Sequence, residues 1–537
     1  MKKNISSYFK SFSFFEKIGL AIIISSPILY GIVAYLIKPQ MNYDSAWGLL
    51  VLRSMVRGGE FNFQVYPNFN NLAFDTARFI TWWSPGQYTI PGMFTFFGIT
   101  LGTALVLTSV LFSLLGVVGW FYLFRLIGFS RKDVFITCIA IVGNLFFYRH
   151  FIQYHGGELL LFGVAPWLIS IVWTFRKLPL ISIPIFLLAF LITVFMKLTG
   201  AVLIISLMGG MIATFFCFSR EKILYKSTVL MGTGCLFAII FYLCWVSHGS
   251  SPVHFNHIFS APLDLQFSSI AFAFFEPIGA AFSLGQIISS SVNKIFLNSS
   301  SEISIPHVSA WLFPFSMGIY YLVWKGLKGP FSEYKYFLYG ALSVYVVLFI
   351  LIWILRMPVS FDERHFLPIS LLFSIALVHV FRQHPVFIIR YLFFLILGIS
   401  VIYGIKAFLF NERKNLSLTL GSQGFRHEFV SKRAIDFIRN EIDPIALKNK
   451  DTILFVHSPE VALESSNARI MDSIIKYESI ESLQKMSYRG RISHLYVLLS
   501  DEDVLNGKGE TILKSFKDYQ YSEWKKIDLD GYKMFSQ

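Results

Sequence analysis

Long apolar blocks, separated by short polar segments, recur along the first three quarters of the chain. A helix that crosses the hydrocarbon core of a bilayer needs about 20 mainly apolar residues. The pattern therefore predicts a mainly α fold, a polytopic transmembrane helix bundle with about 11 spans. We place these spans near residues 18–37, 100–124, 134–150, 158–175, 180–196, 199–218, 229–247, 308–325, 336–355, 365–381 and 386–409.

The pattern changes after residue 410 to that of a small soluble domain. The segments "DTILFVHS" and "ISHLYVLLS" are short apolar runs typical of buried strands, and "EFVSKRAIDFIRNEI" and "GETILKSFKDY" have helical spacing. We therefore divide the chain into a transmembrane domain, residues 1–410, and a soluble α/β domain, residues 411–537. No catalytic motif stands out in the second domain, so we expect it to pack on the membrane part or to help hold a substrate.

Composition and charge agree with this division. The chain is 55% hydrophobic and 15% charged, with a mean hydropathy of +0.60, which is too apolar for a soluble protein. Residues 411–537 carry equal numbers of basic and acidic side chains, so the net charge of +14 belongs to the membrane part. If the N-terminus is cytoplasmic, the short basic connections all fall inside and the C-terminal domain lies outside, as the positive-inside rule requires. The excess charge thus indicates topology rather than nucleic-acid binding.

An aspartate, Asp44, follows the first apolar block in the stretch "MNYDSAWGLLVLRSMVRGGEFN". After it, Trp47, Leu50 and Val51 recur at helical spacing, which predicts a short amphipathic helix in the membrane interface. Asp44 has two interpretations. It is either the N-cap of this helix, where its carboxylate accepts hydrogen bonds from the first amides, or a general base at the membrane surface.

Three aromatic residues of the stretch "RFITWWSPGQYTIPGMF" are candidates for sugar binding. Their flat rings suit stacking on a sugar, but Trp and Tyr are also enriched where a bilayer meets water. The residues are Trp82, Trp83 and Tyr88, and the sequence by itself favours the role at the membrane interface.

Cations and carboxylates from three further segments are expected at the outer edge of the membrane. Lys197 lies in the tight turn "VFMKLTG", where it either reaches the headgroup region or binds a phosphate. The stretches "FYRHFIQYHGGELLLF" and "DERHFLP" carry the other candidates, which either pair with one another or hold an anionic lipid and a polar second substrate. They are Arg149, His155, Glu158, Arg364 and His365.

The spacing of two of these residues also fits metal ligands. His155 and Glu158 are three residues apart, as ligands on one helix face are. Two glycines lie between them and no third ligand is evident. The sequence therefore supports neither a metal nor another cofactor.

The order of these features resembles that of the GT-C superfamily of integral-membrane glycosyltransferases. The similarity rests on the Asp-bearing loop after the first span, the "SPGQY…P" stretch, the "KLTG" turn and "ERHFLP" before a late span, and it extends over about residues 1–410. It is greatest to bacterial relatives of protein mannosyltransferases and of the lipid A aminoarabinose transferase. The resemblance implies a polyprenyl-phosphate sugar as donor, an extracytoplasmic glycan, lipid or protein as acceptor, and a multi-pass location in the bacterial plasma membrane.

The same resemblance implies roles for the candidate residues. Asp44 corresponds to the general base of a reaction that inverts the anomeric configuration. Lys197 and Arg364 would hold the lipid phosphate, with Arg149 or His365 as further partners. The residues left for the sugar or the acceptor are Glu158, His155, Trp82, Trp83 and Tyr88.

Two other functions remain open. A transporter or flippase of lipid-linked or anionic substrates usually carries charges at mid-membrane and has two related halves. Here the charges cluster at the predicted outer edge, and no half-to-half repeat is visible. A polymerase or ligase of surface polysaccharide would share the donor and the compartment and would differ in its acceptor.

Overall fold

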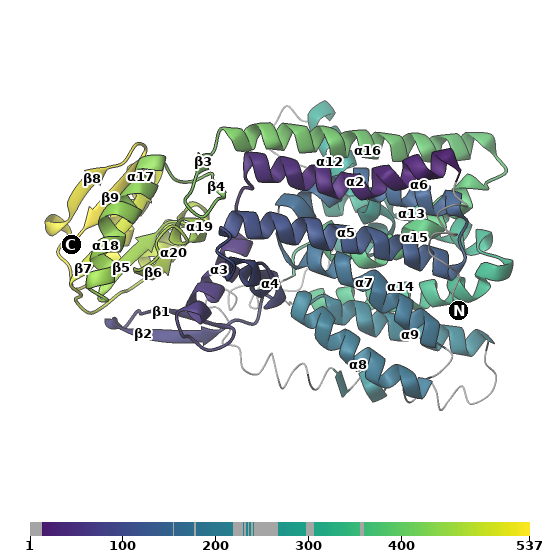
Figure 1. Cartoon of the computed structure of the whole chain (residues 1–537), viewed down its shortest axis with the longest axis horizontal. Coiled ribbons are helices and arrows are strands. Elements are labelled where there is room, and N and C mark those ends of the chain that lie inside the picture. The colour runs from purple at the N-terminus through teal and green to yellow at the C-terminus, as the bar shows by residue number, and fades with distance from the viewer. Residues whose placement is uncertain are drawn as a thin grey trace.

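The computed structural model describes residues 13–153, 155–176, 179–218, 229, 232–234, 236–237, 240, 267–296, 305–354 and 359–537. Figure 1 shows a bundle of long helices at one end of the molecule and a small sheet domain at the other, with the loop after the first helix between them. The predicted fold class, a mainly helical bundle with a small C-terminal α/β domain, is confirmed.

Long apolar helices make up the bundle. Six of the described helices are long and apolar enough to cross a membrane, and the number is up to eight if each of two bent helix pairs is one span. The six are α2 (Phe14–Ile37), α5 (Leu101–Ile127), α7 (Gly157–Phe175), α9 (Gly200–Phe218), α14 (Ser332–Ile354) and α16 (Phe387–Leu416). Further helices of the bundle are α8 (Pro179–Met196), α13 (Ile305–Gly326) and α15 (Leu367–Arg382).

Two bent helix pairs interrupt the regular bundle. α6 (Arg131–Gly143) and the π-helical η1 (Phe147–Gln153) meet at 57°, and the stretch that contains α11 (Phe267–Gly279) meets α12 (Leu284–Phe296) at 94°. The second pair is a correction, because it lies between the spans predicted near residues 229–247 and 308–325, where we predicted none: α11 is largely buried and packs on α13 and α15. With 13 residues and a proline near its end, α11 is too short to be recognised as a span. The span expected near 229–247 lies largely outside the described residues.

Glycines allow α9 and α14 to pack backbone against backbone. A Cβ atom added at Gly210 would lie 2.5 Å from the carbonyl oxygen of Phe337, and one added at Gly340 would lie 2.9 Å from that of Gly209. Larger residues at these positions would push the helices apart. Such close packing matters in lipid, where no hydrophobic driving force brings helices together.

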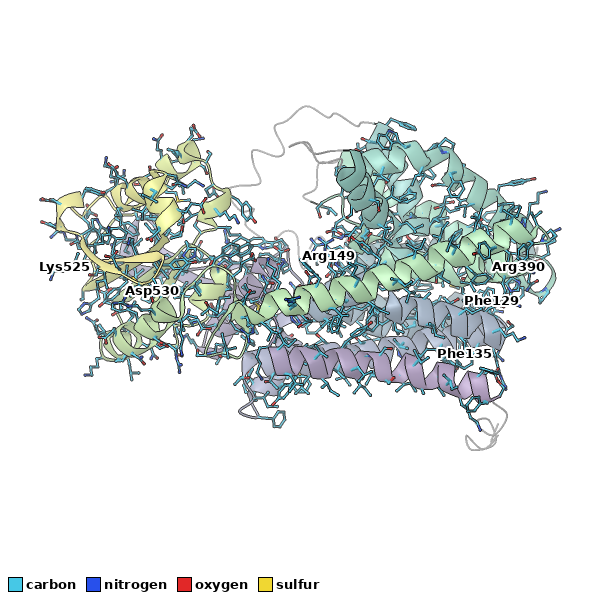
Figure 2. All side chains as sticks on the ribbon, turned by 90° about the horizontal axis from the view of Figure 1, so that it is seen from above. Phe129, Phe135, Arg149, Arg390, Lys525 and Asp530 are labelled. Atoms are coloured by element: carbon cyan, nitrogen blue, oxygen red, sulfur yellow. The ribbon has the colours of Figure 1, made fainter. Side chains whose placement is uncertain are left out.

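The two ends of the bundle differ in their polar groups. At the end far from the C-terminal domain, Phe129 stacks on Phe331 with ring centroids 4.6 Å apart, and Arg382 donates a hydrogen bond to buried Asp133 at 2.5 Å. Figure 2 shows Arg149 at the end that faces the C-terminal domain and Arg390 toward the opposite end. Basic connections and candidate site residues thus lie at opposite ends, as the predicted topology requires, although the sidedness itself stays a prediction.

A five-stranded sheet forms the centre of the C-terminal domain. Its order is β6-β5-β7-β9-β8, with β5 parallel to β6 and β7, and β9 antiparallel to β7 and β8. The two apolar runs predicted as strands are β5 (Thr452–Val456) and β7 (His494–Ser500), which carry most of the buried strand residues. The other strands are β6 (Arg469–Asp472), β8 (Lys525–Asp528) and β9 (Tyr532–Ser536).

Short helices surround this sheet, and the two predicted helices are among them. They are α17 (Lys432–Phe437) with η7 (Ile438–Ile442), α18 (Asp443–Lys448), α19 (Pro459–Ala462), α20 (Ile480–Gln484), α21 (Asp501–Leu505) and α22 (Lys508–Ser515). A small pair of strands, β3 (Thr419–Leu420) and β4 (Arg426–His427), connects the domain to α16, which continues to Leu416. The division at residue 410 stays a prediction.

The loop between α2 and α5 joins the bundle to the C-terminal domain. The expected helix is α3 (Tyr43–Val56), and an antiparallel hairpin that we did not predict, β1 (Phe63–Asn68) and β2 (Asn71–Phe79), comes between it and α4 (Gly86–Thr95). The domain contacts α3 directly: Trp47 donates a hydrogen bond to Asp472, and Arg53 Nη2 donates to the carbonyl oxygen of Ala468 at 2.7 Å. The position of α3 therefore depends on the docked domain.

Glu460, on α19 next to α3, gives this docking a pH dependence. The carboxyl group is buried near Tyr43, and burial raises the pKa of Glu460 from 4.5 to about 8. Between these values the folded state binds a proton that the unfolded state has released, so stability falls as the pH rises, by at most about 1.4 kcal/mol per pH unit. We expect thermal unfolding to show this fall in the wild type and a weaker one in Glu460→Gln. Equal pH profiles for the two proteins would contradict the assignment.

Candidate functional site

Asp44 lies in the first turn of α3 and does not cap it. The N-cap is Asn42, whose side-chain Oδ1 accepts a hydrogen bond from the amide of Asp44 at 3.0 Å. The capping interpretation of Asp44 is therefore wrong, because the helix begins at Tyr43, two residues earlier than a cap at Asp44 would place its start. The Asp44 carboxylate is 38% exposed and lies 3.9 Å from Nη1 of Arg364.

Arg364 is placed among three carboxylates from three segments of the chain. It belongs to the short helix η6 (Glu363–His365), which Asp362 caps by accepting a hydrogen bond from the Arg364 amide at 3.1 Å. The guanidinium Nε lies 3.3 Å from Asp362 Oδ2 and 3.5 Å from Glu158 Oε1, in addition to the contact with Asp44. One cation thus connects the start of α3, the start of α7 and the loop before α15.

Lys197 and Glu158 form a buried ion pair beside Arg364. Lys197 follows the last residue of α8, and its Nζ donates a hydrogen bond to Glu158 in the first turn of α7. The side chains are 13% and 3% exposed, respectively. Burial lowers the pKa of Lys197, and the carboxylate of Glu158 opposes this change.

A glycine brings the two members of this pair together. A Cβ atom added at Gly157 would lie 2.5 Å from the carbonyl oxygen of Met196 and 2.9 Å from Cβ of Lys197. Only glycine lets α7 begin this close to the end of α8. The "HGGE" and "KLTG" stretches therefore meet in space.

These groups line two adjoining spaces. The larger is a polar cavity of about 320 Å³. The smaller is a narrow crevice in which Glu158, Lys197 and Arg364 meet apolar side chains that include Trp120, Phe151 and Leu371. Arg364 lines both and so stands where the polar cavity adjoins the apolar crevice. The polar cavity is lined by Gln40, Met41, Asn42, Asp44, Arg149, His150, Gln153, Asp362 and Arg364.

The remaining phosphate-binding candidates, Arg149 and His365, differ in their exposure to solvent. Arg149 is exposed and lines the polar cavity, and its contact with a lipid phosphate stays a prediction. His365 is buried, and burial together with Lys197 and Arg364 lowers the pKa of His365 to about 3. Its ring is therefore neutral near pH 7 and offers a hydrogen bond instead of a positive charge. The assignment of His365 to the lipid phosphate stays a prediction.

Four residues expected near the sugar or acceptor line neither space. His155 is buried, and its Nδ1 lies 3.2 Å from Ser109 Oγ on α5. Tyr88 is fully buried and donates a hydrogen bond to Asn62. The other two, Trp82 and Trp83, lie against each other, with Trp83 also 5.4 Å from Trp47, between α3 and the C-terminal domain. In this structure these side chains support the loop, and none reaches the cavity.

Two further residues belong to the candidate site, and of these only Gln153 was missed from the sequence. His150 is buried with its Nε2 3.8 Å from Oε1 of Glu363, and Gln153 lines the cavity next to it. Both lie on η1, whose π-helical turn gives these neighbours a spacing that a regular helix would not. Among the described residues there is no group of three or more His, Cys, Asp or Glu suited to hold a metal ion.

Comparisons with known proteins are few. No family model matches the chain, and no curated protein matches it. A search of solved structures finds ArnT from Cupriavidus metallidurans, once in the apo state and once bound to undecaprenyl phosphate. Each match has 10% identity and a TM-score of 0.39 and covers 96% of this chain and 97% of the ArnT chain. ArnT is a lipid A aminoarabinose transferase, from the branch of the GT-C superfamily that the sequence motifs resemble.

Proposed function

We propose that this protein is an inverting glycosyltransferase that moves a sugar from a polyprenyl-phosphate donor to an extracytoplasmic acceptor at the outer face of the bacterial plasma membrane. One observation carries the proposal: a partly exposed carboxylate, Asp44, shares a cavity with two arginines at the point where that cavity adjoins an apolar crevice. A lipid-linked phosphate needs cations at such a boundary, and a hydroxyl nucleophile needs a base beside them.

The donor phosphate would contact Arg364 and Arg149. Arg364 presents its guanidinium to both spaces, and Arg149 lines the polar one. Lys197 is engaged by Glu158 and its side chain is only 13% exposed, so it would act mainly by keeping the local charge positive when the phosphate arrives. Glu158 and Asp362 would hold the side chains of Lys197 and Arg364 in place, because a carboxylate that accepts a charge-assisted hydrogen bond fixes the orientation of its cationic partner.

Asp44 has the properties of a general base. Its carboxylate is more exposed than those of Asp362 and Glu158, which are 31% and 3% exposed, so an acceptor reaches it most easily. Asp44 would take the proton of the acceptor hydroxyl while the oxygen forms a bond to the anomeric carbon. The bond from that carbon to the phosphate oxygen breaks, and its electron pair leaves with the phosphate, which Arg364 and Arg149 stabilise. A single displacement of this kind inverts the anomeric configuration.

The test is release of polyprenyl phosphate. Purified protein in lipid nanodiscs is incubated with a panel of polyprenyl-phosphate sugars, and the freed lipid phosphate is measured with wild type and with Asp44→Asn as matched control. We expect release from at least one donor in the wild type and a strongly reduced rate in the variant. Movement of an intact lipid-linked sugar across a proteoliposome membrane without release would indicate a carrier and would overturn the proposal.

A further inference from the structure

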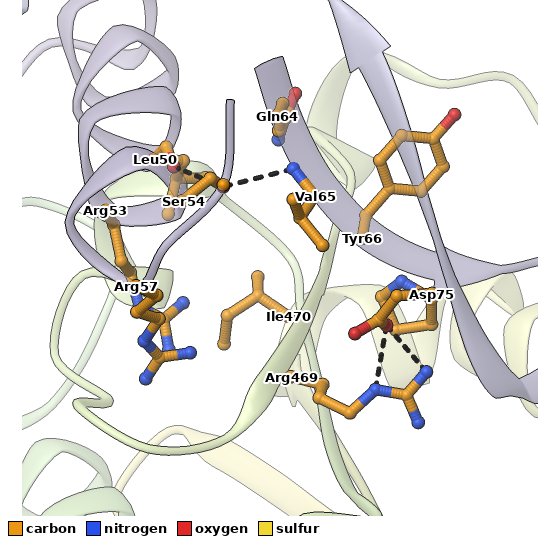
Figure 3. A pocket seen from close by; sticks show the side chains of 12 residues that line it. Leu50, Arg53, Ser54, Arg57, Gln64, Val65, Tyr66, Asp75, Arg469 and Ile470 are labelled. Carbon is orange, nitrogen blue, oxygen red and sulfur yellow. Dashed lines mark hydrogen bonds and ion pairs between the residues drawn. The ribbon is translucent and has the colours of Figure 1, made fainter. Parts of the chain in front are cut away.

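A second cavity, of about 190 Å³, lies between the far end of α3, the β1–β2 hairpin and β6 (Figure 3). Three arginines line it: Arg53 and Arg57 from α3, and Arg469 from β6. Among the described lining residues, Asp75 supplies the one carboxylate. The proposed reaction uses none of these side chains.

Arg469 and Asp75 neutralise each other. Nη2 and Nε of Arg469 donate to Asp75 Oδ1 at 2.6 and 2.8 Å, and Nη1 lies 3.4 Å from Asp451. Figure 3 shows this pair on one side of the cavity and Arg53 with Arg57 on the other. The positive charge that remains is therefore that of Arg53 and Arg57.

Arg53 and Arg57 are positioned by neutral groups. Arg53 Nη2 and Arg57 Nη1 donate to the carbonyl oxygen of Ala468 at 2.7 and 3.2 Å, and Arg57 also donates to that of Ser466. Carbonyl oxygens orient a guanidinium group without cancelling its charge. Asp443 attracts both arginines, but its oxygens already accept hydrogen bonds from residues 465–467.

The guanidinium group of Arg53 is also incompletely satisfied. Nε of Arg53 is buried and has no hydrogen-bond partner among the described residues. Burial and the neighbouring charge of Arg57 lower the pKa of Arg53 to about 9. An anion between these groups would relieve both the repulsion and the missing hydrogen bond.

We propose that this cavity binds an anionic group, a phosphate or a carboxylate, that the acceptor substrate carries. The planar, two-pronged guanidinium group matches both anions. The cavity exceeds by far the ~10–15 Å³ that a single water needs, and Gln64 and Tyr66 of β1 add polar groups to its wall.

α3 sets the distance between this cavity and Asp44. At 1.5 Å per residue, the helix covers about 14 Å from Asp44 to Arg53 and about 20 Å to Arg57. An acceptor that reaches both places carries its anionic group about 14–20 Å from its nucleophile, so it is an extended molecule such as an acidic glycan. The identification of the ligand as part of the acceptor rests on the proposed function, whereas the binding of an anion in this cavity does not.

The experiment measures inorganic phosphate binding to the purified full chain in phosphatidylcholine nanodiscs, by thermal stabilisation at constant ionic strength. Gln64→Glu places a carboxylate in the cavity and removes none of the hydrogen bonds between α3 and the C-terminal domain. We expect the apparent phosphate affinity to fall about 10-fold or more in Gln64→Glu and in Arg57→Gln, because a charge-assisted contact is blocked or lost. Arg57→Lys should keep more of the affinity.

Gln520→Glu is the matched control, since it makes the same chemical change at an exposed position of the C-terminal domain. Phosphate bound near Arg364 contributes equally to all these proteins, so the differences report on the second cavity. Unchanged affinity in Gln64→Glu and Arg57→Gln would overturn the proposal, and so would an equal loss in Gln520→Glu, which would reflect net charge alone.

Repeating the measurement in nanodiscs that contain phosphatidylglycerol separates the two possible sources of the anion, a lipid headgroup and the acceptor. If phosphatidylglycerol in the nanodisc abolishes phosphate binding, the cavity holds a lipid headgroup and the assignment to the acceptor is wrong. Persisting binding supports the acceptor. Because the assay needs no donor and no turnover, a failure of the transferase proposal leaves its result unaffected.

Discussion

Asp44→Asn is expected to lower the turnover number about 10²- to 10⁴-fold, with expression and donor binding close to those of the wild type. An amide has the size of the carboxylate but cannot take a proton from an acceptor hydroxyl. The fold should tolerate the change, because the cap of α3 is Asn42 and the contact of the carboxylate with Arg364 is long, at 3.9 Å. Single-turnover kinetics with a saturating donor would measure the chemical step.

Asn42→Ala is the control for this variant. It removes the cap and should cost roughly 0.5–2 kcal/mol of stability while leaving the carboxylate in place. Asp362→Asn is a second control, since Asp362 also contacts Arg364 but accepts a hydrogen bond from a backbone amide. A normal turnover number for Asp44→Asn would end its assignment as the base.

Lys197→Met is expected to destabilise the protein by about 3 kcal/mol and to reduce donor use. The substitution leaves the buried carboxylate of Glu158 without its hydrogen-bonded partner, a change that typically costs 3–5 kcal/mol. We expect the lower end of that range because Nε of Arg364 remains 3.5 Å from Glu158. Thermal unfolding in nanodiscs would measure the loss.

Adding Glu158→Gln to Lys197→Met separates the structural role of the pair from its role in donor binding. The double variant no longer buries an unpaired charge, so most of the stability should return. Donor use should stay at least about 10-fold below that of the wild type, because the cation near the phosphate is still missing. Recovery of both stability and donor use would show that the pair serves only to hold α7 against α8.

The sequence predicted the parts of the fold that depend on continuous apolar runs. α2, α5 and α16 are longer than a bilayer requires, and β5 and β7 are largely apolar because both faces of their sheet are covered. α11 was missed because it has 13 residues and contains Pro277. The β1–β2 hairpin was missed because "FQVYPNFNNLAFDTARF" lacks a regular alternation, and its register shifts at Pro67 and Asn68.

The depth of the candidate site residues in the membrane could be predicted because these residues lie at helix ends. Asp44, Glu158, Lys197 and Arg364 each lie within two residues of a helix end, so their depth could be inferred from the apolar pattern. The direction in which a side chain points could not be inferred in the same way. The backbone of His155 has a positive φ of 54°, and this conformation accompanies a ring that contacts Ser109 instead of the cavity. Tyr88 faces Asn62 because α4 packs its buried face on α3.

Gly157 has a consequence for how this protein could vary in evolution. The residue bears no reactive group, yet the distance between Glu158 and Lys197 depends on its lack of a side chain. Any larger residue would shift α7 along or away from α8 and so change an electrostatic contact through simple steric exclusion. Selection for the charged pair would therefore act on a neighbouring position that carries no charge. A search for functional residues that scores only polar side chains would overlook it.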